Sequence, residues 1–113
     1  GQRIGRTIGI PTVNLSVPEN VLPPAHGVYI TEVFLPDGRH FPGVTNVGTR
    51  PTVSDSPALS VETFLLGFDG DLYGQEIRLE FCRRLRGERK FDSLEELRDE
   101  IRRNIRQTEE YFR

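Results

Sequence analysis

The stretch GRTIGIPTVNLSVPENV, residues 5–21, combines turn-forming residues with hydroxyl- and amide-bearing side chains. Glycines let a backbone approach a phosphate closely and turn its N–H groups toward it. Thr12 offers a hydroxyl oxygen and Asn14 an amide oxygen, which are hard ligands suited to Mg²⁺ beside phosphates. In an extended segment these two side chains would lie on the same side. The stretch matches neither the P-loop nor the dinucleotide fingerprint, so an ordinary loop and a phosphate-binding segment both stay open.

Glu62 is a further residue whose position in the sequence suggests a chemical role. It lies in the run SVETFLL, where strand periodicity puts it on one face with Phe64 and Leu66, opposite Val61, Thr63 and Leu65. A half-buried glutamate has a raised proton affinity and can act as a general base. The alternative is that Glu62 lies near a strand end and reaches water.

Five cations lie within eight residues near the C-terminal third of the chain: Arg83, Arg84, Arg86, Arg89 and Lys90. Such a run is usually a solvated surface, but it also suits a small anion site. His26 and His40 are not spaced as metal ligands, and we assign them no role.

Composition excludes several classes of protein. The 113 residues suit one domain, and their net charge of -2 argues against a protein built mainly to hold nucleic acid. The one cysteine, Cys82, excludes an internal disulfide and agrees with a reducing cytoplasm, where we expect the protein to be. No apolar run could span a bilayer, so we expect no membrane partner. The sequence begins at Gly1 without any methionine, which indicates a domain of a longer protein.

Around these residues the pattern predicts strands and one helix. Runs rich in β-branched and aromatic residues, or with a period of two, predict strands near 26–35, 39–48, 59–68 and 75–85. Pro36-Asp37-Gly38 marks a hairpin turn, Pro42 implies an edge or a bulge, and 49–58 reads as a polar loop.

Ser93 followed by Glu96 predicts a helix start. An apolar stripe continues that helix through Leu94, Leu97, Ile101, Ile105, Thr108 and Phe112. Together these elements predict a small antiparallel barrel with a helix packed on it.

Five motifs then occur in an order that resembles the riboflavin kinase family. GRTIGIPTVNL contains the Pro-Thr-x-Asn core as Pro11-Thr12-Val13-Asn14. GVY, TNVGTRPT, VETFLLGFDGDLYG and LRGERKFDSLEEL follow at 27–29, 45–52, 61–74 and 85–97. The resemblance covers essentially the whole chain and is closest to the bacterial form, in which this module follows a nucleotidyltransferase domain in a bifunctional FAD synthetase.

The resemblance implies an all-β fold with a C-terminal helix, in which six strands form a closed Greek-key barrel. It implies that 1–113 is one riboflavin kinase domain truncated at its N-terminus, in which we expect the family's first strand and the adenylyltransferase domain to be missing. A barrel without that strand would expose an edge.

The resemblance also implies roles for individual residues. Glu62 matches the catalytic base that takes the proton of the riboflavin 5′-hydroxyl. Thr12 and Asn14 match the ligands of Mg²⁺ and of the ATP phosphates. Arg86 lies in the loop that closes over the flavin. The flap over the nucleotide is matched by Gly5, Arg6 and Gly9.

The implied activity is phosphorylation of riboflavin by ATP to give FMN and ADP, with Mg²⁺ accompanying the ATP. The implied partners are these small molecules and a covalently fused FMN adenylyltransferase domain. Two other classes compete with this interpretation. A non-catalytic flavin- or nucleotide-binding barrel should lack the base, whereas Glu62 is present. A small barrel that binds oligonucleotides or proteins should carry exposed aromatics on a basic strand face, and these strands carry few cations.

Overall fold

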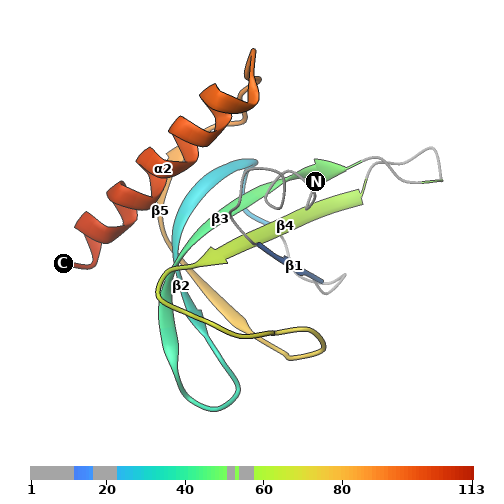
Figure 1. Ribbon diagram of the computed structural model, residues 1–113. Coiled ribbons are helices and arrows are strands. Elements are labelled where there is room, and N and C mark those ends of the chain that lie inside the picture. The colour runs from blue at the N-terminus through green and yellow to red at the C-terminus, as the bar shows by residue number, and fades with distance from the viewer. Residues whose placement is uncertain (1–11, 17–22, 51–52, 54–57) are drawn as a thin grey trace.

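A computed structural model describes residues 12–16, 23–50, 53 and 58–113 (Figure 1). Within them lie five strands and one helix: β1 Val13–Leu15, β2 Gly27–Phe34, β3 His40–Arg50, β4 Ala58–Leu65, β5 Arg78–Arg86 and α2 Leu94–Tyr111. Every strand pairing is antiparallel. The predicted all-β class with a C-terminal helix is therefore confirmed.

The predicted closed six-stranded barrel is wrong for the described part of the chain. The strands form one open sheet in the order β1-β4-β3-β2-β5. Closure requires each strand to have two neighbours, but among the described residues β1 pairs only with β4 and β5 pairs only with β2. With three residues, β1 could in any case offer only a short edge. A first strand ahead of the glycine-rich loop lies outside the described residues.

The four longer strands correspond to the four predicted runs. β2 and β3 form the expected hairpin, in which the Leu35 N–H donates to the Arg39 carbonyl at 2.8 Å across the predicted turn. Pro42 lies in the central strand β3, but the pairing of β3 with β4 starts only at Gly43, so the proline occupies a local edge. Thr49 and Arg50 extend β3 into the predicted polar loop, of which 51–52 and 54–57 lie outside the described residues.

The two faces of the sheet differ in burial along β4. Val61, Thr63 and Leu65 are buried, whereas Glu62 and Phe64 between them are half-buried. The buried face carries a core cluster of Val33, Leu35, Leu65 and Leu72. It also carries a chain of three fully buried threonine hydroxyls, in which Thr31, Thr45 and Thr63 are linked by hydrogen bonds of 2.9 Å.

Helix α2 begins where the sequence predicts. Ser93 is its N-cap, and its hydroxyl accepts a hydrogen bond from the Glu96 N–H at 3.1 Å. The Glu96 carboxylate accepts from the Asp92 N–H at 3.2 Å, so both groups near the helix start are satisfied. The helix lies obliquely beside the sheet and contacts β3 (Figure 1). No helix among the described residues is long and apolar enough to cross a membrane.

Candidate active site

A continuous row of directly opposed residues crosses all five strands of the sheet. Asn14 on β1 is the register partner of Glu62 on β4, and Glu62 is the partner of Asn46 on β3. Asn46 is opposite Val28 on β2, which in turn is opposite Arg86 on β5. Directly opposed residues in a sheet project from the same face. The row therefore places three of the predicted site residues, Asn14, Glu62 and Arg86, on one face.

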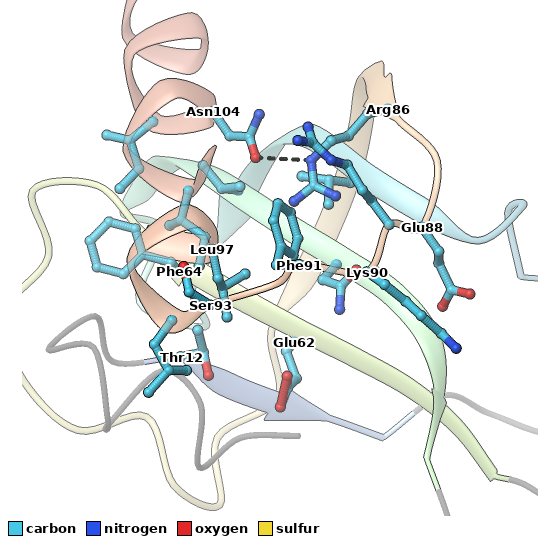
Figure 2. Close-up of a pocket in the computed structure, with 17 residues that line it drawn as sticks. Thr12, Glu62, Phe64, Arg86, Glu88, Lys90, Phe91, Ser93, Leu97 and Asn104 are labelled. Carbon is cyan, nitrogen blue, oxygen red and sulfur yellow. Dashed lines mark hydrogen bonds between the residues drawn. The ribbon is translucent and has the colours of Figure 1, made fainter. Parts of the chain in front are cut away.

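A cavity of about 800 Å³ lies between this face and helix α2 (Figure 2). Its apolar walls come from Val28, Val44 and Phe64 of the sheet and from Leu97, Ile101 and Ile105 of the helix. Its polar lining includes Thr12, Asn46, Glu62, Arg86, Arg89 and Lys90. An apolar slot with a few polar groups at its ends is typical of a site for a small organic ligand.

Thr12 and Glu62 lie at one end of this cavity (Figure 2). The Thr12 hydroxyl oxygen and one Glu62 carboxylate oxygen, Oε1, are buried and have no hydrogen-bond partner among the described residues. Burying such oxygens without partners costs free energy, so two of them at the same end of one cavity suit an absent ligand.

Arg86 lies at the opposite end of the cavity (Figure 2). Its Nε is 3.1 Å from Glu100 Oε2 and donates to Asn104 Oδ1 at 3.3 Å. The guanidinium groups of Arg86 and Arg89 both lie over the Phe91 ring, 5.5 and 4.9 Å from its centroid. Burial lowers the pKa of Arg86, and the Glu100 carboxylate opposes this shift. The Glu62 end therefore carries a carboxylate, whereas the Arg86 end combines the cations of Arg86 and Arg89 with the carboxylates of Glu88 and Glu100.

The structure brings most of the predicted site residues together. Asn14 of β1 is directly opposite Glu62 of β4, and Thr12 immediately precedes β1. Asn14 is exposed and lines a second, neighbouring cavity that Thr12 also borders. Arg86 is the last residue of β5 rather than part of a loop, and three strand spacings, roughly 14 Å, separate it from Glu62. The predicted nucleotide-flap residues Gly5, Arg6 and Gly9 lie outside the described residues.

Sequence reasoning missed three polar residues of this site. Asn46 lies within the quoted motif TNVGTRPT. The register of β3 with β4 places it beside Glu62. Glu100 and Asn104 lie on α2, and Asn104 interrupts the apolar stripe between Ile101 and Thr108. That polar interruption was the available signal, because a buried amide in an apolar stripe requires a partner.

The oxygen atoms near the Glu62 end suit a hard divalent cation carried with phosphates. Thr12 and Glu62 supply a hydroxyl and a carboxylate oxygen at this end of the cavity, and Asn14, the cross-strand partner of Glu62, supplies an amide oxygen at the border of the neighbouring cavity. The described residues contain no cluster of three or more His, Cys, Asp or Glu side chains that could bind a metal by themselves. The residues at this end therefore suit a cation that brings further oxygen ligands with it, such as those of a nucleotide.

Fold and site together define a small antiparallel β domain with a cavity between the sheet and the helix that suits a small organic ligand. The family model Flavokinase, described as riboflavin kinase, matches residues 1–112. The chain belongs to the riboflavin kinase family.

Several curated relatives are similar over nearly the whole chain. The bifunctional riboflavin kinase/FMN adenylyltransferase of Haemophilus influenzae is 38% identical over 99% of this chain, and that of Escherichia coli K12 is 40% identical over 99%. The chain spans only 36% and 35% of the lengths of these two proteins. A crystal structure from Streptococcus pneumoniae, described as a macrolide-efflux protein, superimposes with a TM-score of 0.86 at 31% identity. This match covers 96% of this chain and 35% of that one.

Proposed function

We propose that this domain transfers the γ-phosphoryl group of ATP to the 5′-hydroxyl of riboflavin, giving FMN and ADP. The observation that carries the proposal is the buried Glu62 oxygen, which has no hydrogen-bond partner among the described residues and lies at one end of a helix-covered cavity. The curated relatives, which are bifunctional riboflavin kinase/FMN adenylyltransferases, support the choice of substrates.

Glu62 is the general base of this reaction. A primary hydroxyl is a poor nucleophile at neutral pH, and a positioned carboxylate that removes its proton contributes about 10²–10⁴-fold to the rate. The hydroxyl oxygen attacks the γ-phosphorus, the proton passes to Glu62, and the bond between the γ-phosphorus and the β–γ bridging oxygen breaks to release ADP. Asn14 and Asn46 on either side of Glu62 supply amide groups that can hold the reacting oxygens in place.

Thr12 and Asn14 hold Mg²⁺ and the ATP phosphates. Their oxygens are hard ligands, and the buried, unpaired Thr12 hydroxyl supports this role. When bound, the metal ion neutralises charge on the phosphoryl group that is transferred. Gly5, Arg6 and Gly9 complete the nucleotide site in this proposal.

The flavin ring occupies the apolar slot, with its ribityl chain directed toward Glu62 and its polar ring edge toward Arg86. Glu62 and Arg86 are separated by three strand spacings, so they cannot contact the same hydroxyl. Phe64 of the sheet and Leu97 of the helix face the ring between these ends. The cations are then placed to donate hydrogen bonds to ring carbonyl oxygens.

In the native polypeptide the domain is fused to an FMN adenylyltransferase domain. The support is that the chain spans about a third of relatives named as bifunctional enzymes. The product of this domain, FMN, would be the substrate of such a partner domain.

The test is product analysis in a mixture of riboflavin, ATP and Mg²⁺. We expect FMN and ADP to form in equal amounts, and we expect no ADP with lumichrome, which has the flavin ring but no ribityl hydroxyl. ADP release that does not depend on riboflavin, or flavin binding without FMN formation, would overturn the proposal. The native polypeptide should be assayed beside the isolated chain.

A further inference from the structure

We infer that Glu100 and Asn104 of α2 are positioning residues that fix the Arg86 guanidinium at the flavin-ring end of the cavity. The inference rests on the proposed riboflavin site and extends it to a part of the helix to which the sequence motifs gave no role.

The contacts join a strand end to the middle of the helix. Arg86 Nε donates a hydrogen bond to Asn104 Oδ1 at 3.3 Å and lies 3.1 Å from Glu100 Oε2, with which it forms an ion pair. The Arg86 and Glu100 side chains are only 18% and 11% exposed, and Asn104 is 1% exposed. Ion pairs on a protein surface contribute little, but a shielded pair with further hydrogen bonds holds its geometry.

Asn104 fixes both partners at once. Its oxygen accepts from Arg86, while its Nδ2 donates to Glu100 Oε2 at 3.1 Å and to Gln107 Oε1 at 3.0 Å. The amide therefore orients the carboxylate that in turn orients the guanidinium. Glu100 Oε1 also lies 3.5 Å from Arg89 Nη1, so the same carboxylate holds the second cation that borders the cavity.

These contacts leave one nitrogen of the Arg86 guanidinium, Nη2, available for a ligand. Nε is used by α2, and Nη1 donates to the Gly87 carbonyl at 3.3 Å. Within the described residues Nη2 makes no hydrogen bond, and Arg86 borders the cavity (Figure 2). A guanidinium held at two of its nitrogens loses little rotational freedom when the third donates to a ring carbonyl oxygen.

The test compares riboflavin and ATP kinetics in E100Q, which keeps the size of the side chain but removes its charge. We expect KM for riboflavin to rise about tenfold, which corresponds to about 1.4 kcal/mol, while kcat and KM for ATP stay within about twofold of the parent. E100D, which keeps the charge but shortens the side chain, should raise KM for riboflavin by a smaller factor of about three. In R86K/E100Q the second substitution should add little to R86K, because both remove the same contact.

The matched control is E110Q on the same helix. Glu110 forms an ion pair with Arg113, and both side chains are exposed. E110Q should leave every kinetic constant unchanged. A lower melting temperature of E100Q with a parental KM for riboflavin would show a purely structural pair and overturn the inference. If E100Q does not fold, the KM of E100D decides: a rise of threefold or more supports the inference, and a parental value overturns it. A parent that makes no FMN would instead contradict the proposed function.

Discussion

Asn14 of β1 and Glu62 of β4 are direct cross-strand partners, and Asn46 of β3 faces Glu62 from the other side. Side chains at such positions have Cβ atoms about 4.5–5.5 Å apart. The carboxylate is therefore flanked by two amides on one face of the sheet. This arrangement places the proposed base between the proposed metal ligand and a residue that can position the substrate.

Replacing Glu62 by Gln should lower the rate of FMN formation by about 10²-fold or more, because the amide keeps the shape but cannot accept the proton. Binding of riboflavin and of ATP should change little, since the loss is confined to the transition state. Single-turnover FMN formation and the melting temperature, measured on one preparation, distinguish this from a structural role. E76Q, at an exposed position, is the control. Full turnover in E62Q would end the assignment of the base.

Thr12→Ala and Asn14→Ala should each raise KM for Mg·ATP about tenfold or more, the effect of losing one hydrogen bond to a charged group. KM for riboflavin should stay close to the parental value. Steady-state kinetics at controlled free Mg²⁺ measure both constants. Ser16→Ala, just beyond β1 and exposed, is the matched control and should change neither. Unchanged ATP kinetics in both variants would remove Thr12 and Asn14 from the site.

Asn46→Asp should shift the acidic limb of the pH–rate profile to higher pH. A second carboxylate directly opposite Glu62 disfavours ionisation of both groups, so the base would be lost at a higher pH than in the parent. Asn46→Ala should instead lower kcat without moving the limb. The pH dependence of kcat measures the difference. If Asn46→Asp has the parental profile, the two side chains do not interact in the working enzyme.

Thr45→Val should destabilise the domain by about 1–3 kcal/mol, because it breaks the middle of the buried threonine chain and leaves the hydroxyls of Thr31 and Thr63 without that partner. Thr45 projects from the face opposite Asn46, so KM for riboflavin should not change. Denaturant unfolding measures the loss of stability. Thr49→Val, at an exposed position of the same strand, should cost less than about 0.5 kcal/mol. Equal stabilities would show that the chain of hydroxyls contributes nothing.

Much of the fold and of the site was predictable from neighbouring residues. The period of two in β4 predicted which face would carry Glu62, and Ser93 with Glu96 predicted the start of α2. Both signals are local, because side-chain direction and helix capping depend on residues only a few positions apart. The spacing of Thr12 and Asn14 predicted side chains on the same side on condition that the segment is extended, and Asn14 does lie in a strand, β1.

Three features depended on contacts between distant segments: the open edges of the sheet, the row of opposed residues across its five strands, and the contacts of Arg86 with α2. Whether a sheet closes is decided by which strands lie at its edges and how long they are. In the part of the chain that the structure describes, the edges of the open sheet are the three-residue β1 and β5. Asn46 joins Glu62 only through the register of β3 with β4, and Arg86 meets Glu100 only because α2 returns against the sheet. The sequence by itself determined the chemistry available, the face on which Glu62 lies and the family. Only the tertiary structure decided which amides flank the carboxylate and what holds the arginine, because register and docking are set by contacts between residues far apart in the chain.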